Sequence, residues 1–366
     1  MQNKLQQYFP MIRTRKEIQQ IIQSNPKLQN IFYSWKEEQR ENFLDLCTGV
    51  KGVKMMYDFM GKEILDPEST PERVNELLSL LLKQKVEIIE VLPNEGTRLA
   101  DESTLLIKDI VVQLEDGSIV NLEIQKIGYM FPGERGACYS ADLLLRQYRR
   151  IRSRLANKNK FSYKDIKPVY TIILFETSPE IFHKYPEDYI HYFEHVSDTG
   201  IKMNLLQKYI FVPLDIFKKI HHNENRTIKI ETRLDAWLAF LCMDDPEVII
   251  EIIERYPDFK EMYEQVYEIC RNVEEVMNMF SKELLELDRN TTKLMIDEMQ
   301  KDIEQKEAVI QQNKEILAQK DEALAQKDNA LAQKNEALVQ KDNALAQKDD
   351  EIRKLKELLQ KRNKIE

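Results

Sequence analysis

Long apolar runs are missing from this 366-residue chain. No stretch of about 18 consecutive apolar residues occurs, and the segment from Met1 to Arg15 is polar and of mixed charge. The sequence therefore predicts neither a membrane span nor a secretory signal. We expect a cytoplasmic protein that has no membrane partner.

Glycine, cysteine and histidine are scarce, with nine, four and five residues. No GxGxxG or GxxxxGK motif is present, so nucleotide-driven chemistry has no support. The cysteines form no CxxC pair and no zinc-like spacing with the histidines, which favours reduced thiols. His191 and His195 stand four residues apart and would form a metal-binding pair if helical, although surface or core histidines are the commoner interpretation of such a pair.

Basic residues are too few to coat DNA, because the net charge of the chain is −9 and nonspecific DNA affinity comes mainly from Lys and Arg. Any nucleic-acid contact must come from a local basic patch. The segment from Lys301 to Glu366 is balanced in charge, so the net negative charge lies on the first 300 residues. We expect such an acidic body to use metal ions near phosphate.

Short β-branched runs separated by turn residues predict strands at 86–92, 105–114, 118–126, 169–175 and 209–212. A helix-length stretch, 135–156, lies between the third and fourth runs, with Ala141, Leu143, Leu144, Leu145, Tyr148, Ile151 and Leu155 expected on its apolar side. A hairpin, a crossover helix and a further strand indicate an α/β fold with a mixed sheet.

Four segments are expected along the chain. Residues 1–50 form an N-terminal helical lead, 51–222 the α/β domain, 223–300 a helical appendage and 301–366 a coiled coil. Leucine or isoleucine recurs every seven residues in the last segment, at 317, 324, 331, 338, 345, 352 and 359. This period predicts a left-handed seam and a homo-oligomer, although Asp321 and its equivalents are poor partners in the seam. An isolated solvated helix is the alternative.

Polar residues interrupt two neighbouring apolar strands in the segment LLIKDIVVQLEDGSIVNLEIQK. Asp109 lies in the first strand, and Glu123 and Gln125 lie in the second. A two-residue turn at 116–117 would place the acids on opposite faces of the sheet. A three-residue loop at 115–117, with glycine in the left-handed conformation, would pair Asp109 with Glu123 on one face.

Opposed carboxylates repel each other, and a divalent cation with oxygen ligands relieves the repulsion. The second register therefore predicts a Mg²⁺ (or Mn²⁺) site in which Gln125 orients water or phosphate. A solvated sheet face with ordinary polar residues is the simpler alternative.

A series of polar and aromatic residues begins in the hairpin and continues into the following helix: Asp109, Glu123-Ile124-Gln125, Gly133-Glu134-Arg135, Tyr139 and Gln147-Tyr148. This series resembles the Rpn-type recombination-promoting nucleases and transposases of the PD-(D/E)XK superfamily, over roughly residues 55–219. The resemblance implies a PD-(D/E)XK nuclease-like mixed sheet flanked by helices, with a helical C-terminal appendage and a coiled-coil tail.

By this resemblance Asp109 and Glu123 would be metal ligands, with the Ile124 backbone carbonyl as a further one. The third family position usually holds lysine and here is Gln125, which carries no charge. Lys126 should point to the other face of the sheet. Glu63 would be an additional acid, and Arg135 and Tyr139 would contact phosphate or brace the acids.

Arg146, Arg149 and Arg150 share a helix face and could follow a DNA backbone, although a solvated amphipathic helix is an equal alternative. We expect a metal-dependent DNA endonuclease that hydrolyses phosphodiester bonds and is linked to recombination, mobile elements or phage defence. The alternatives are an inactive interaction protein that works through its coiled coil, and an RNase.

Overall fold

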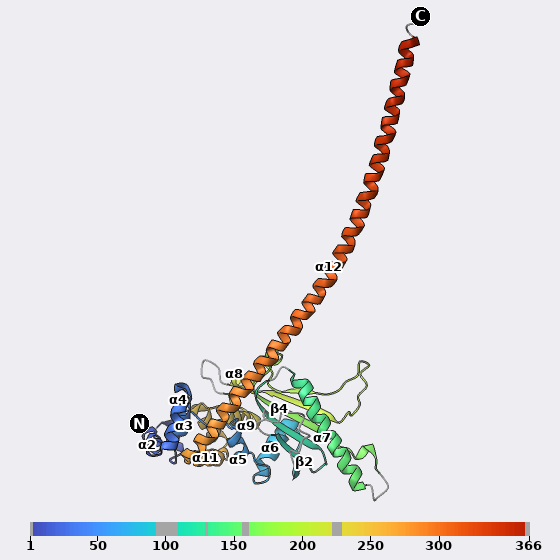
Figure 1. Cartoon of the computed structure of the whole chain (residues 1–366). Coiled ribbons are helices and arrows are strands. Elements are labelled where there is room, and N and C mark those ends of the chain that lie inside the picture. Colours follow the sequence, from blue (N-terminus) through green and yellow to red (C-terminus); the bar gives the residue numbers. More distant parts are fainter. Residues whose placement is uncertain (1–2, 93–108, 129–130, 156–160, 222–228, 363–366) are drawn as a thin grey trace. The chain divides into compact units, whose positions relative to one another are not determined.

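The computed structural model describes residues 3–92, 109–128, 131–155, 161–221 and 229–362 (Figure 1). Contacts divide the chain into two compact units, Met1–Asp297 and Glu298–Glu366. The domain boundaries at 50, 222 and 300 stay predictions. In the structure the first unit includes the N-terminal helices together with the sheet and the helices that follow it.

Among the described residues, the helices and short 3-10 turns are α1 (Lys4–Tyr8), α2 (Arg15–Ser24), α3 (Pro26–Ser34), α4 (Glu37–Thr48), α5 (Asp58–Ile64), α6 (Pro71–Leu82), α7 (Pro132–Leu155), η2 (Tyr163–Asp165), η3 (Phe182–Lys184), α8 (Leu214–His221), α9 (Arg233–Cys242), α10 (Pro246–Arg255), α11 (Phe259–Ile269) and α12 (Val273–Arg362). The strands are β1 (Ile88–Val91), β2 (Asp109–Leu114), β3 (Ile119–Ile127), β4 (Val169–Thr177), β5 (His191–Phe193) and β6 (Gln207–Pro213).

The strands form one mixed six-stranded sheet in the order β1-β2-β3-β4-β6-β5. Neighbours β1, β2 and β3 pair antiparallel, β3, β4 and β6 pair parallel, and β5 closes the edge antiparallel to β6. The parallel connection from β3 to β4 carries α7, as a crossover requires. The expected α/β sheet flanked by helices is therefore confirmed. The start of the second predicted strand, residues 105–108, lies outside the described residues.

Each face of the sheet packs against different helices. Even-numbered strand residues such as Val112, Leu122 and Leu174 join the main core, which includes helices from both ends of the first unit. Odd-numbered residues lie on the opposite face, where Leu143 of α7 packs with Val111, Ile119 and Val169 of the strands. Helix α7 therefore covers the face that carries Glu123 and Gln125.

The buried stripe of α7 differs from the apolar side predicted for this helix. Gly136, Ser140, Leu143 and Gln147 are buried, whereas Leu145 is 53% exposed. The prediction was right for Leu143, which is buried with Leu144 packed beside it, and wrong for the remaining positions because it followed hydrophobicity, while this part of the sheet offers the helix a polar surface. Small side chains at 136 and 140 let the helix approach the sheet closely.

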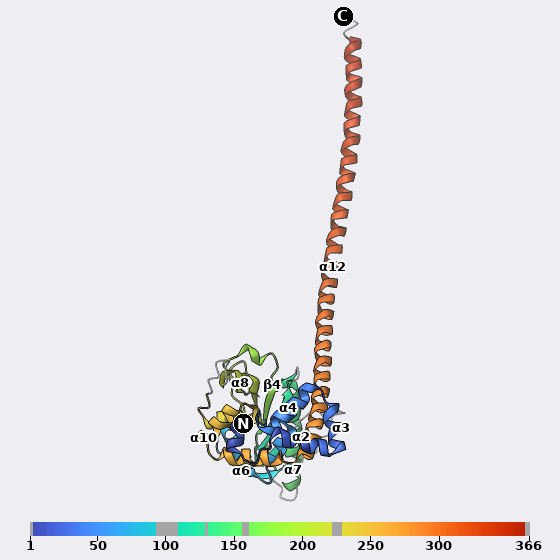
Figure 2. The ribbon, with the colours of Figure 1, turned by 90° about the vertical axis from the view of Figure 1, so that its left-hand side faces the viewer.

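The N-terminal helices pack through aromatic side chains onto helices from the other end of the unit. Phe9 lies 4.9 Å from Tyr267 of α11, and Trp35 lies 5.1 Å from Phe280 of α12, between ring centroids. Figure 2 shows α2, α3 and α4 gathered beside the first part of α12. Capping boxes fix the starts of short helices, as at Thr14, whose hydroxyl accepts from the Glu17 backbone N–H.

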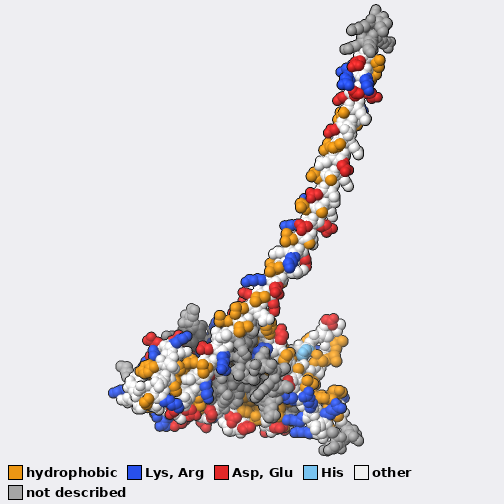
Figure 3. Space-filling view, viewed as in Figure 1, with side chains coloured by type: hydrophobic (Ala, Val, Ile, Leu, Met, Phe, Trp, Pro, Cys, Tyr) orange, Lys and Arg blue, Asp and Glu red, His pale blue; other side chains and the backbone are white. Residues whose placement is uncertain are grey.

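Helix α12 continues without a break into the second unit. The heptad leucines of the second unit are exposed in the single chain; for example, the exposed fraction is 59% for Leu317 and 58% for Leu345. Apolar side chains recur along the length of this helix in Figure 3. A helix with an exposed apolar seam of period seven is suited to association with a second helix.

Candidate functional site

The turn between β2 and β3 is a three-residue loop. Gly117 has a φ of +86°, in the left-handed region, its N–H donates to the Leu114 carbonyl at 2.9 Å, and the Leu114 N–H donates to the Ser118 carbonyl at 2.9 Å. The Asp116 carboxylate accepts from the Ser118 N–H and fixes the loop. This is the bulged geometry predicted from the glycine.

Asp109 is the Cα partner of Glu123 in the antiparallel ladder. Directly opposed residues of a hairpin project to the same face of the sheet. The alternative register, with the acids on opposite faces, is therefore excluded. The Asp109 side chain lies outside the described residues.

Glu123 and Gln125 are almost completely enclosed, with exposed fractions of 0% and 1%. The Gln125 Nε2 donates a hydrogen bond of 2.5 Å to Glu123 Oε1. The Gln125 Oε1 is buried and has no hydrogen-bond partner among the described residues. Burying a carboxylate is costly unless hydrogen bonds or a cation compensate, and Gln125 supplies one such bond.

Lys126 lies on the opposite face of the sheet, as strand alternation predicts. Its ammonium pairs with the Glu283 carboxylate of α12, and both side chains are 6% exposed. The same ammonium lies 5.3 Å from the centroid of the Tyr57 ring. Lys126 therefore cannot supply the charge that the family usually places beside the acids.

The first turns of α7 pack on the face of the sheet that carries Glu123, over β6 and β4. A Cβ added at Gly136 would meet Tyr209 and Phe211 of β6 at 3.6 and 3.7 Å and Ile173 of β4 at 3.8 Å, and Ile173 is the Cα partner of Glu123. On this turn Arg135 donates to the Tyr139 hydroxyl at 3.1 Å. The roles predicted for these two residues, to contact phosphate or brace the acids, stay predictions.

The three arginines predicted to follow DNA differ in their surroundings. Arg146 is bound to Asp142 one turn before it at 2.5 Å. Arg150 pairs with Glu90 of β1 at 3.2 Å and also donates to Gln113 of β2. Arg149 is exposed. Acidic neighbours thus offset part of this patch, and its role in binding nucleic acid stays a prediction.

The remaining candidates take no visible part in the site. Glu63 is exposed on α5, and Ile124 turns its side chain into the main core, so only its backbone carbonyl could serve a ligand. His191 lies on β5 and His195 beyond it, so the helical spacing needed for a metal-binding pair is absent. Among the described side chains, which do not include Asp109, no three His, Cys, Asp or Glu converge as a metal cluster.

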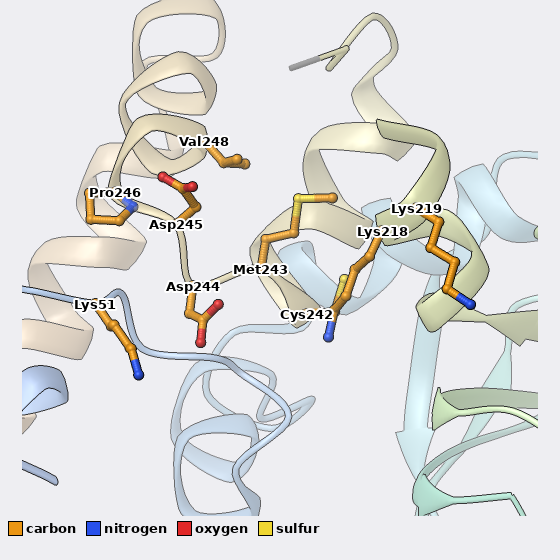
Figure 4. A pocket seen from close by; sticks show the side chains of 9 residues that line it. All are labelled: Lys51, Lys218, Lys219, Cys242, Met243, Asp244, Asp245, Pro246 and Val248. Atoms are coloured by element: carbon orange, nitrogen blue, oxygen red, sulfur yellow. The ribbon is translucent and has the colours of Figure 1, made fainter. Parts of the chain in front are cut away.

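A pocket of about 400 Å³ lies apart from these acids and is lined by Lys51, Lys218, Lys219, Cys242, Met243, Asp244, Asp245, Pro246 and Val248 (Figure 4). Lys54 connects it to the sheet by pairing with Asp244 at 3.7 Å and with Glu176 of β4 at 3.4 Å. Even-numbered strand residues, such as Glu176 and Lys126, lie on the face of the sheet opposite Glu123. The pocket therefore adjoins that opposite face.

Sequence reasoning missed three polar residues beneath α7. Asn121, Thr171 and Ser140 are at most 2% exposed. One signal was available, because Asn121 stands two residues before Glu123 and so shares its face. The other two come from β4 and α7, and no local pattern marks them.

A comparison with family models matches residues 55–298 to the PD-(D/E)XK nuclease family transposases. The chain belongs to this family. The match takes in the hairpin, α7 and the first part of α12. No curated protein and no solved structure matches the chain.

Membership of the PD-(D/E)XK family confirms the resemblance inferred from the hairpin and supports a nuclease-type function. Nucleases of this family typically use divalent metals and act on nucleic acid. Within the described residues, no helix is both long enough and apolar enough to span a membrane.

Proposed function

We propose that this protein is a metal-dependent DNA endonuclease that hydrolyses phosphodiester bonds, with a role in recombination, mobile elements or phage defence. The observation that carries the proposal is the enclosed Glu123 carboxylate, which is held by Gln125 and whose residue is paired directly with Asp109. Two acids placed opposite each other on a sheet face repel, and this repulsion lowers stability unless a bound cation compensates.

Asp109 and Glu123 would hold the ion, with the Ile124 backbone carbonyl as a further ligand. The donor set fits Mg²⁺ or Mn²⁺, which prefer carboxylate and carbonyl oxygens. The unpartnered Gln125 Oε1 adds a further buried oxygen on the same face. When bound, the cation would supply electrostatic activation of the phosphodiester and of the attacking water.

Gln125 has two tasks in this proposal, one for each end of its amide. Its Nε2 donates to Glu123 and fixes the direction of that carboxylate. Its Oε1 is placed to accept a hydrogen bond from a water molecule and to orient it. An uncharged amide cannot neutralise the charge that develops on phosphate, so that task passes to Arg135 with Tyr139 beside it.

DNA would be bound along α7, where Arg149 is exposed and Arg146 and Arg150 could exchange their acidic neighbours for phosphate. The contacts would be to the backbone and would carry no sequence preference. The acidic charge of the whole chain makes this binding depend on a local patch.

The decisive experiment compares nicking of supercoiled plasmid by the full chain in Mg²⁺, Mn²⁺ and EDTA. Asp109→Asn and Glu123→Gln keep side-chain volume and hydrogen-bonding capacity while removing charge. We expect metal-dependent nicking that falls by at least about 100-fold in either variant, because both carboxylates are needed for the ion. Glu115→Ala, exposed in the loop of the same hairpin, is the matched control and should nick like the wild type.

Nicking that survives both substitutions would refute the assignment of the site. Manganese binding measured by calorimetry on the same variants separates loss of the ion from loss of a later step. A single-stranded RNA substrate in the same buffers decides between DNA and RNA cleavage.

A second candidate is a noncatalytic interaction protein that retains the nuclease fold. Gln125 at the lysine position, together with the engagement of Lys126 by Glu283 on the far face, favours this alternative. Absence of cleavage in every metal, combined with absence of Mn²⁺ binding, would select it.

A further inference from the structure

The space between α7 and the sheet contains a layer of buried polar atoms that the proposed nuclease chemistry does not use. Asn121 of β3 and Thr171 of β4 are neighbours in the parallel ladder, and Ser140 belongs to the buried stripe of α7. The Asn121 Oδ1, the Thr171 Oγ1 and the Ser140 Oγ are all buried without a hydrogen-bond partner in the described part of the chain.

The packing of α7 places these three residues at one level. Gly136 lies over Phe211 of β6 and its ladder partner Ile173 of β4, and Leu143 packs with Val169 and Ile119. Ser140 lies between Gly136 and Leu143 on the same helix face, and Thr171 lies between Ile173 and Val169 on the same strand face. Ser140 is therefore brought over Thr171 and its neighbour Asn121.

The layers on either side of this level differ in character. Leu143, with Val111, Ile119 and Val169, closes one side with apolar groups. On the other side stands Glu123, two residues further along β3 on the same face of the sheet. The polar level is thus bounded by apolar side chains on one side and lies next to the Glu123 carboxylate on the other.

Buried hydroxyl and amide oxygens in native proteins almost always have a partner, and ordered water supplies it where protein groups do not. Two hydroxyls can donate and the Asn121 Oδ1 can accept, and water satisfies both kinds of group. Residues two apart on a strand are separated by about 7 Å, a gap that one bridging water can span between side chains.

We propose that Asn121, Thr171 and Ser140 bind ordered water beneath α7, and that this water positions the Glu123 carboxylate. The second part rests on the proposed function, since it concerns a metal ligand. The three residues are positioning residues and do not touch the substrate.

Serine-to-alanine substitutions at two places on α7 test the first part. Alanine favours a helix over serine, so Ser153→Ala, at an exposed position on the same helix, should leave the melting temperature unchanged or raise it. Ser140→Ala should lower the melting temperature of the metal-free protein by several degrees, because the buried water would lose one of its hydrogen-bond partners. Thr171→Val, which keeps the shape and removes the hydroxyl, should do the same.

An equal or higher melting temperature for both Ser140→Ala and Thr171→Val would overturn the water site, because removing an unbonded hydroxyl relieves a cost. These measurements need no metal, so they stand even if the proposed function fails.

Calorimetric titration with Mn²⁺ tests the second part on the folded variants. Loss of an outer hydrogen-bonding partner typically weakens metal binding by 10–100-fold. We expect Thr171→Val to weaken Mn²⁺ binding by about 10-fold and Thr171→Ser, which keeps the hydroxyl, to restore most of it. Unchanged Mn²⁺ affinity in Thr171→Val would overturn the positioning of Glu123. Failure of the wild type to bind Mn²⁺ would instead count against the metal site itself.

Discussion

In the proposed site, Gln125 places an amide at the position where PD-(D/E)XK nucleases usually carry lysine. An amide at this position acts by hydrogen bonding and carries no charge. The Gln125 Nε2 donates to Glu123 Oε1 at 2.5 Å, and the Gln125 Oε1 has no hydrogen-bond partner among the described residues. A neutral residue can orient groups but cannot stabilise a phosphorane-like charge. In the proposed site the positive charge would then come from another element, and Arg135 at the start of α7 is the residue we propose for it.

The cysteines give a residue-scale prediction about reactivity. Burial raises the pKa of the Cys242 and Cys270 thiols to about 12 and that of Cys47 well above its usual value. The reactive form is the thiolate, and raising the pKa keeps the thiol protonated at pH 8. Cys138 is exposed on α7. We expect a disulfide reagent at pH 8 to label one thiol rapidly and the other three only after unfolding.

Cys138→Ser should abolish the fast labelling and leave the slow labelling intact. Rapid reaction of two or more thiols in the wild type would contradict the burial of the other three.

At the scale of elements, β3 is held from both sides by groups far away in the sequence. Gln125 faces α7, while the next residue, Lys126, pairs with Glu283 of α12. A buried ion pair adds little net stability compared with an apolar pair, but leaving one charge alone is costly. The pair therefore fixes where α12 packs on the strand that carries the site.

Lys126→Met should lower the free energy of unfolding by about 3–5 kcal/mol, because it leaves the Glu283 carboxylate buried without its cation. Combining Lys126→Met with Glu283→Leu should recover most of that loss, since two apolar side chains replace two charges. Urea unfolding of the single and double variants gives the coupling energy. Additive losses would show that the two side chains do not depend on each other.

Local signals predicted the hairpin of β2 and β3 well, because Gly117 after Glu115-Asp116 specifies both loop length and register. They also predicted α7 and the helical segment 223–300, in which α9, α10 and α11 lie. The three-residue strand β5 was missed because it is too short to show alternation. The Lys126–Glu283 pair and the layer of Asn121, Thr171 and Ser140 join distant segments, so only the folded chain reveals them.

At the scale of the whole molecule, the chain combines a compact unit with a long helix whose apolar seam is exposed. The compact unit, Met1–Asp297, contains the sheet and the aromatic contacts of the N-terminal helices. The heptad leucines of the second unit have no apolar partner within that helix, since one helix cannot cover its own seam. We expect self-association to be a property of the tail.

Truncation before Lys301 should leave a folded protein of monomeric mass, whereas the full chain should be oligomeric in light scattering. The double substitution Leu324→Glu with Leu338→Glu in the full chain should also give monomers. Gln326→Glu with Gln340→Glu, on the outer side of the same heptads, is the matched control and should keep the oligomer. An unchanged oligomeric mass after truncation would place the interface in the first unit.

The tail repeats are nearly identical to one another, from LAQKDEA through LAQKDNA to LAQKNEA. Two such helices shifted by one repeat exchange each leucine for an equivalent leucine and lose only the contacts at the ends. One step corresponds to about 10 Å along the helix. If two tails pair, their alignment is therefore degenerate, with a ladder of nearly equal staggers that differ in discrete steps of one repeat.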